Sequence, residues 1–260
     1  MKYILTHIIL LSATLFALSG EVIFEEKCSS CHAPYIPQNQ LISNFFEHNN
    51  TVLKLKAPTL NQLSFSLKDD IAGRKGDAES QKMVVEEYIE EYLDDPSKIR
   101  GVVSWRITQY FDKMPSMKGE LSEDEIEAVS EYIFDYMENM ITKHSAKTYS
   151  VEEAMQIAKK EGKIVAIKGY MPYCSWCLKM DREVLVEQKI KNIMEKDFVF
   201  AKVNVLTEKL PLGMKRLSTP SFYFIDSDGK TILDMVAGSG TLEEFVALLE
   251  SMKAKSKKKN

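Results

Sequence analysis

The chain has 260 residues, of which 45% are hydrophobic and 28% are charged, and its net charge is −4. This length suffices for two modest domains, and the composition is that of a folded protein rather than a disordered one. The charge is divided unevenly, because residues 21–145 carry −10 and residues 146–260 carry +5. A strongly acidic first half argues against nucleic acid as a partner.

The first twenty residues have the pattern of a secretory signal peptide. Lys2 precedes an apolar run that ends at Leu18, and the small residues Ser19 and Gly20 follow. This order predicts export and cleavage near Ser19 or Gly20. The alternative is an uncleaved N-terminal anchor, although the run is short for a membrane-spanning helix. We therefore expect a periplasmic protein with no membrane span after cleavage.

All four cysteines lie in C-x-x-C pairs, and His32 directly follows the first pair, Cys28 and Cys31. C-x-x-C-H is the attachment signature of c-type haem. Two thiols one helical turn apart can each add to a haem vinyl group, and the adjacent histidine can reach the iron. The sequence predicts one covalently attached haem c. A zinc site would need a second ligand pair at finger-like spacing, and a plain disulfide would leave the histidine unexplained.

Helical patterns dominate the first half of the chain. Residues 33–50 have the composition of a loop. The last predicted helix is the strongest, because Ser122 and Glu125 form a capping box and an apolar stripe then continues to Ile141. No run with clean two-residue alternation predicts a strand before residue 145. Apolar positions near a 3.6-residue period predict further helices over residues 60–71, 79–93 and 102–111.

Residues 21–145 resemble a class I c-type cytochrome domain, which has an all-α fold. Members of this family have C-x-x-C-H near the start, a proline-containing segment that resembles residues 57–60, and a Met-Pro loop before the closing helix. Met114, followed by Pro115, matches that loop. The resemblance implies that His32 and Met114 are the two iron ligands, and a thioether ligand raises the reduction potential of a haem.

Other ligand and packing assignments stay open at this level. Met117 lies three residues after Met114 and could ligate instead, and His48 is a weaker alternative. Trp105 and Arg106 could pack on the haem and pair with a propionate, since arginine suits carboxylates. A core tryptophan and a surface arginine explain the same two residues equally well.

The second half alternates between helical and strand patterns after a short linker at residues 144–149. A capping box at Ser150 and Glu153 begins it, and Cys174 and Cys177 follow the first predicted strand at the start of a helix. Predicted strands cover residues 164–167, 198–205, 222–225 and 231–236, and predicted helices cover residues 150–161, 175–186, 188–195 and 242–252.

Residues 150–252 resemble an α/β thioredoxin-fold domain, in which a strand leads to C-x-x-C and a Thr-Pro pair precedes a later strand. The resemblance places Pro220 at the family's cis-proline position. It implies that Cys174 attacks a substrate disulfide and that Cys177 resolves the mixed disulfide, with the helix N-terminus stabilising the thiolate. Many thioredoxins have a buried acid six residues before the first cysteine, whereas this chain has Lys168. Its ammonium either favours the thiolate or extends to solvent.

These patterns predict an all-α cytochrome c fold followed by an α/β thioredoxin fold, in an exported protein that combines electron transfer with thiol–disulfide oxidoreductase activity. Two alternatives are an accessory factor that reduces disulfides of partner proteins in cytochrome maturation or sulfur oxidation, and a non-enzymatic electron carrier whose second domain docks a partner. Expected partners are redox proteins with disulfides or haem. The predicted boundaries are a signal peptide at 1–20, a cytochrome domain at 21–145, a thioredoxin-like domain at 146–252 and a disordered basic tail at 253–260.

Overall fold

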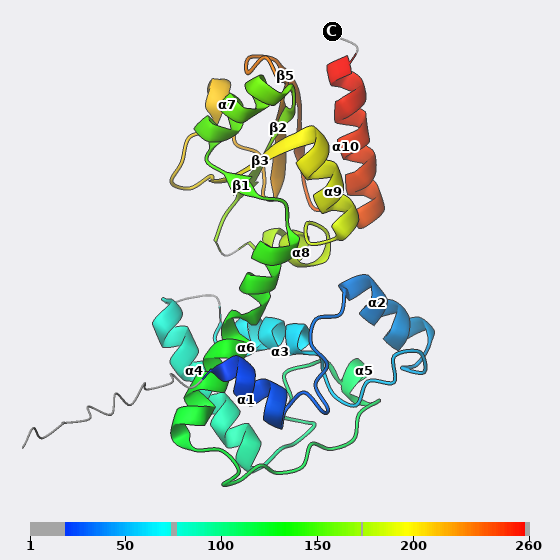
Figure 1. Cartoon of the computed structure of the whole chain (residues 1–260), viewed down its shortest axis with the longest axis vertical. Helices are drawn as coiled ribbons and strands as arrows, with labels where there is room; N and C mark the ends of the chain where they lie inside the picture. The colour runs from blue at the N-terminus through cyan, green and yellow to red at the C-terminus, as the bar shows by residue number, and fades with distance from the viewer. Residues whose placement is uncertain (1–18, 74–76, 173, 258–260) are drawn as a thin grey trace, which may run out of the picture.

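The computed structural model describes residues 19–73, 77–172 and 174–257. It contains a helical half and an α/β half, which are joined by the long helix α6, Glu123–His144 (Figure 1). The expected signal peptide falls almost entirely outside the described residues. Among the helices in the described ranges, none is long and apolar enough to cross a membrane.

The helical half packs three helices against α6, and these are α1 (Gly20–Lys27), α3 (Leu60–Ser66) and α4 (Ala78–Asp94). Their shared core includes Phe24, Leu60, Val85 and Phe134, one side chain from each helix. Gly20 permits the close crossing of α1 and α6, because a Cβ atom at this position would lie 2.0 Å from the Ala128 carbonyl oxygen. Shorter segments complete this half: α2 (Gln38–Ile42), the π-helices η1 (Ser43–Glu47) and η2 (Leu67–Ile71), and α5 (Trp105–Thr108).

Most helices expected here are confirmed. Ser122 and Glu125 form the predicted capping box of α6, and the described part of residues 21–145 contains no strand, as predicted. The loop expected over residues 33–50 is wrong, because α2 and η1 occupy much of it. The sequence suggested a loop because asparagine has a low helix propensity. In the structure Asn44 is accommodated by a local hydrogen bond, in which its Nδ2 donates to Asn50 Oδ1 at 2.8 Å.

The α/β half is built on a five-stranded sheet with the order β1-β3-β2-β4-β5. The β1, β3 and β2 strands are parallel, and β4 and β5 are antiparallel to their neighbours. The short β1 was not expected, because it lies inside the predicted linker and becomes a strand only by pairing with β3. The strands are β1 (Thr148–Tyr149), β2 (Ile164–Tyr170), β3 (Phe198–Asn204), β4 (Ser221–Ile225) and β5 (Ile232–Ala237).

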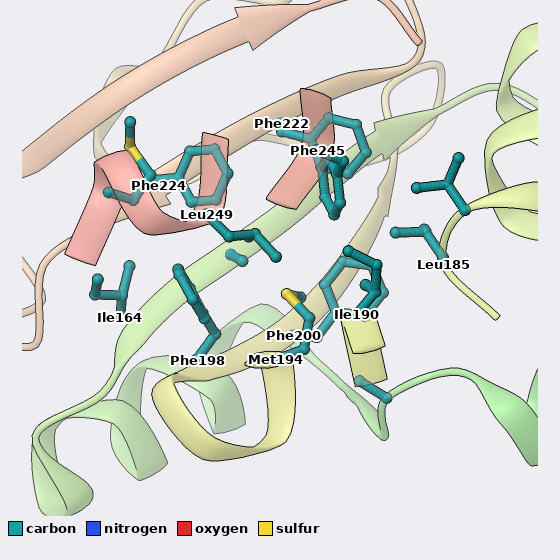
Figure 2. Close-up of a cluster of buried hydrophobic side chains, with 14 of the residues drawn as sticks. Ile164, Leu185, Ile190, Met194, Phe198, Phe200, Phe222, Phe224, Phe245 and Leu249 are labelled. Atoms are coloured by element: carbon teal, nitrogen blue, oxygen red, sulfur yellow. The ribbon is translucent and has the colours of Figure 1, made fainter. Parts of the chain in front are cut away.

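Helices cover both faces of this sheet. Alternate residues of β2 point to opposite faces, so Val165 packs toward α7 (Val151–Glu161) and Ile164 packs on the other side. That other side is covered by α8 (Ser175–Glu183), α9 (Gln188–Asp197) and α10 (Leu242–Lys257). Phenylalanines from β3 and β4 meet Phe245 and Leu249 of α10 in the core between them (Figure 2).

The basic tail is not disordered up to Lys257, because α10 continues through it. Lys253 pairs with Asp197 at 2.8 Å, and the Ser256 hydroxyl donates to Asp226 at 2.6 Å. These contacts were invisible in the sequence because the partners lie at least thirty residues away. The end of α10 lies on the side of the α/β half that faces away from the helical half (Figure 1).

The two halves contact each other through α8, which packs near α6 and α2, and through α9, whose Lys191 Nζ donates to the Lys143 carbonyl at 3.0 Å. Arg182 of α8 reaches the helical half, where its guanidinium lies 3.8 Å from the centre of the Phe65 ring and 3.5 Å from Asp69 Oδ2. The side chains of Arg182 and Asp69 are only 6% and 13% exposed. The helix that follows the second C-x-x-C pair is therefore held against the helical half.

Candidate functional site

The first C-x-x-C pair lies in a turn that continues directly from α1. The amides of Cys31 and His32 both donate to the Cys28 carbonyl, at 3.1 and 3.0 Å. This single turn brings both thiols and the imidazole to one side of the chain. Both cysteines are free thiols, and burial raises the pKa of Cys28 to about 11, so its sulfur is protonated at neutral pH.

The His32 imidazole is oriented by the proline-containing segment. Its Nδ1 donates to the Pro58 carbonyl at 2.8 Å, which leaves Nε2 as the nitrogen with a free lone pair. Burial lowers the pKa of His32, so the ring is neutral and able to ligate a metal. The proline-containing segment at residues 57–60 thus fixes the orientation of the His32 ring through the Pro58 carbonyl.

A largely apolar cavity opens beside this turn. Cys28, Cys31 and His32 line it, and so does Met114, more than eighty residues further along the chain. Two thiols, a neutral imidazole and a thioether around an apolar cavity form the donor set that a covalently attached haem needs. These residues fit the group that the sequence predicts. The remaining walls are formed mainly by apolar and aromatic side chains, including Phe24, Leu63, Leu67, Tyr88, Tyr92 and Phe111.

The cavity separates the alternatives that the sequence left open. Met117, His48 and Arg106 are not among the described residues that line it, and Trp105 is 71% exposed at the surface. Of the two candidate methionines, Met114 lines the cavity, and its role as iron ligand stays a prediction. Sequence reasoning missed three lysines on the cavity wall, which are Lys56, Lys98 and Lys113. Their ammonium groups can pair with the carboxylates of a group bound in the cavity.

The second C-x-x-C pair begins α8. Cys174 is the N-cap residue, and the Cys177 amide donates to Cys174 Sγ at 3.2 Å. The two sulfurs form a disulfide. Cys174 is 9% exposed and Cys177 is 2% exposed, so Cys174 is the more accessible sulfur but is more covered than the sequence suggested. The neighbouring Trp176 is 57% exposed.

The structure also describes the two other residues that the sequence singled out in this domain, Pro220 and Lys168. The Thr219–Pro220 peptide bond is cis, as expected, and β4 begins at the next residue, Ser221. Ser221 pairs with Gly169 at the end of β2, just before the chain enters the C-x-x-C segment. Lys168 is fully buried, so the alternative that its amine extends to solvent is wrong.

Comparison with known families agrees with this geometry. Residues 16–133 match the family of the cbb3-type cytochrome c oxidase subunit III, and residues 151–253 match a thioredoxin-like domain family. The chain joins a cytochrome c domain to a thioredoxin-like domain. The all-α fold of the first and the α/β fold of the second are those that the sequence predicted.

Individual relatives cover parts of this two-domain protein. A protein of Aquifex aeolicus without an assigned function is 25% identical over 116 residues, which are 44% of this chain and 71% of that protein. Among solved structures, a thioredoxin from Thermus thermophilus is 26% identical with a TM-score of 0.39, and covers 43% of this chain and 90% of its own. A redox protein from Chlamydomonas reinhardtii is 19% identical with a TM-score of 0.34, and covers 79% of this chain and 70% of its own.

Proposed function

We propose that this protein is an exported redox protein in which a mono-haem cytochrome c domain carries electrons and the thioredoxin-like domain exchanges disulfides with partner proteins. The observation that carries the proposal is the apolar cavity that Cys28, Cys31, His32 and Met114 line together. The apolar segment before Ser19 and the haem-attachment motif support a periplasmic location.

The cytochrome domain holds its cofactor with four side chains. Cys28 and Cys31 would hold the haem through thioether bonds, while His32 and Met114 would supply the two iron ligands. When bound, haem c takes up and releases one electron. The protein contributes a neutral imidazole fixed by Pro58 and walls that exclude water. Low polarity and thioether ligation both raise a haem potential.

The thioredoxin-like domain performs thiol–disulfide exchange. In the reduced protein the Cys174 thiolate attacks one sulfur of a partner disulfide, and the other partner sulfur leaves as a thiolate. Cys177 then loses its proton to solvent and attacks Cys174, which releases the second partner sulfur and restores the Cys174–Cys177 disulfide. The amide of Cys177, directed at Cys174 Sγ, favours the thiolate that starts this sequence.

The test uses the full protein produced in a host that attaches haem c. Haem should remain with the chain through denaturing electrophoresis, because thioether bonds are covalent, and Cys28→Ala/Cys31→Ala should lose it. Loss of haem from the unaltered chain contradicts the cytochrome assignment. The protein should also reduce insulin disulfides, and Cys177→Ser should trap mixed disulfides through Cys174. Trapped cytochrome-maturation or sulfur-oxidation proteins would favour the accessory role, and absence of any exchange would favour the electron carrier with a docking domain.

A second candidate function is electron transfer between the two domains, and the packing of α8 against the helical half favours it over two independent modules. Residues 60–71 lie between the cavity and α8. Leu63 and Leu67 line the cavity, while Phe65 and Asp69 contact Arg182 of α8. Oxidation of the dithiol releases two electrons and two protons, so an external one-electron acceptor must remove the first electron before the second follows. Anaerobic stopped-flow spectroscopy after selective reduction of the dithiol tests it, and an unchanged haem spectrum contradicts it.

A further inference from the structure

Lys168 is the one lysine among the described residues with a side chain that is entirely buried. A buried ammonium needs partners to offset the loss of water, and Lys168 has two. Its Nζ donates to the carbonyl oxygen of Cys177 at 3.0 Å and pairs with Asp181 Oδ2 at 2.6 Å. Both partners belong to α8, the helix that carries the redox-active cysteines. The amine therefore connects the central strand β2 to the first and second turns of that helix.

Asp181 is shared between two lysines. Its Oδ1 accepts from Lys202 Nζ at 3.1 Å, and Lys202 lies on β3 directly opposite Lys168 on β2. One carboxylate therefore faces two ammonium groups, and Lys168 is the one whose Nζ also contacts the cysteine segment, at the Cys177 carbonyl. On the other side, Lys168 pairs in register with the apolar Phe222 of β4. The charged groups that act on Lys168 are thus Asp181 and Lys202, and Cys177, whose carbonyl accepts from Nζ, adds a titratable thiol when the disulfide is reduced.

Burial lowers the pKa of Lys168 to about 8, although the charge of Asp181 acts in the opposite direction. The ammonium form therefore prevails at neutral pH and is lost above about pH 8. A carboxylate in this place would repel a thiolate, whereas an ammonium attracts one. The substitution of lysine for the acid that many thioredoxins have here thus reverses the sign of the charge that the reduced cysteines experience.

We propose that Lys168 is a positioning residue for disulfide exchange, because its ammonium, fixed by Asp181 and the Cys177 carbonyl, stabilises the thiolate formed on reduction and makes the Cys174–Cys177 disulfide more oxidising. The inference rests on the proposed exchange function of this pair. A disulfide whose reduced form is stabilised is a stronger oxidant. At neutral pH the charge therefore shifts the equilibrium of this pair toward the reduced protein, whichever partner it meets.

The relevant reaction is exchange with a small dithiol such as dithiothreitol. The protein S–S bond breaks and a new S–S bond closes the small dithiol into a ring, while two electrons pass to Cys174 and Cys177. Of the two protons that the small dithiol gives up, one remains on a protein thiol and one goes to solvent. The other protein sulfur stays a thiolate, and stabilising it shifts the equilibrium toward the reduced protein.

The experiment compares the full-length protein with Lys168→Met, and measures the equilibrium with oxidised and reduced dithiothreitol by alkylation of Cys174 and Cys177 between pH 6 and about 9.5. We expect Lys168→Met to lower the equilibrium constant for reduction about tenfold at pH 7, equivalent to about 30 mV. The difference should vanish above about pH 9, where the wild-type amine is neutral. Lys202→Met is the matched control, because it removes an equal charge from Asp181 at a side chain that is 28% exposed. Its effect should be below about threefold, because exposed charges are screened by solvent.

A purely structural role for Lys168 would change stability but not this pH profile. Equal equilibrium constants for wild type and a folded Lys168→Met at every pH would overturn the inference. If Lys168→Met does not fold, Asp181→Asn replaces it: loss of the counter-charge should move the pH at which the stabilisation disappears down by at least about one unit, and an unmoved profile would equally overturn the inference. Absence of exchange in the wild-type protein would instead overturn the proposed exchange function, which keeps the two failures distinct.

Discussion

The contact of Arg182 with the cytochrome domain predicts how firmly the two domains are held together. Arg182→Ala removes a guanidinium stacked 3.8 Å from the Phe65 ring and paired with Asp69 at 3.5 Å. A desolvated cation–π contact contributes about 2 kcal/mol, and loss of one partner of a buried ion pair costs about 3–5 kcal/mol. The two energies are not additive because both interactions belong to one side chain, and the ion pair between Arg182 and Asp69 has a long separation of 3.5 Å. We therefore take about 3 kcal/mol for the whole contact. This energy would lower the ratio of docked to undocked molecules about a hundredfold.

Small-angle X-ray scattering and limited proteolysis at residues 145–149 measure this change. Arg182→Ala should increase the radius of gyration and speed cleavage of the connection, because the contact lies between the domains rather than inside either core. Lys179→Ala is the matched control, since Lys179 lies on the same helix, is 52% exposed and pairs only weakly with Glu183 at 3.8 Å. Unchanged scattering and cleavage in Arg182→Ala would refute the idea that this contact holds α8 in place.

Three further outcomes follow from the structure. Met114→Ala should abolish the weak sulfur-to-iron absorption of the ferric protein, whereas Met117→Ala should keep it; the reverse result would transfer the ligand role. Removal of residues 253–260 should lower the unfolding temperature of the thioredoxin-like domain, because the pair between Lys253 and Asp197 is lost, and should leave the domain contact unchanged in scattering. Denaturant titrations should show that the free energy of unfolding of the wild type rises by about 3 kcal/mol between pH 8 and 10.5, relative to that of Lys168→Met. The reason is that Lys168 has a pKa of about 8 in the folded protein and binds its proton more tightly in the unfolded chain. A flat difference would contradict the burial of a charged amine.

Local sequence patterns predicted those features that depend on neighbours in the chain. The capping boxes of α6 and α7 are formed as the sequence indicated, because a cap needs only residues three positions apart. The C-x-x-C-H turn is equally local, whereas the cis bond before Pro220 was expected from the resemblance to the thioredoxin fold. Together with the order of strands and helices, these features sufficed to identify both folds.

Features that depend on distant residues were missed or left open. The strand β1 exists only through β3, fifty residues away, and α10 extends beyond residue 252 because Asp197 and Asp226 bind its last turns. Met114 rather than Met117 is among the described residues that line the cavity, a difference that spacing in the sequence does not reveal. The sequence left Lys168 either buried or exposed, because its ion-pair partner Asp181 lies thirteen residues later, on α8.

The two faces of α8 limit how a partner protein can approach the dithiol. Successive residues of a helix point about 100° apart, so Asp181 faces Lys168 inside the thioredoxin-like domain while Arg182 faces the cytochrome domain. The end of α8 is therefore occupied on both sides, and a partner must approach from its beginning, where Trp176 is 57% exposed. Aromatic side chains of this exposure are favoured contact residues in protein interfaces. We therefore expect partner proteins to contact the surface around Trp176.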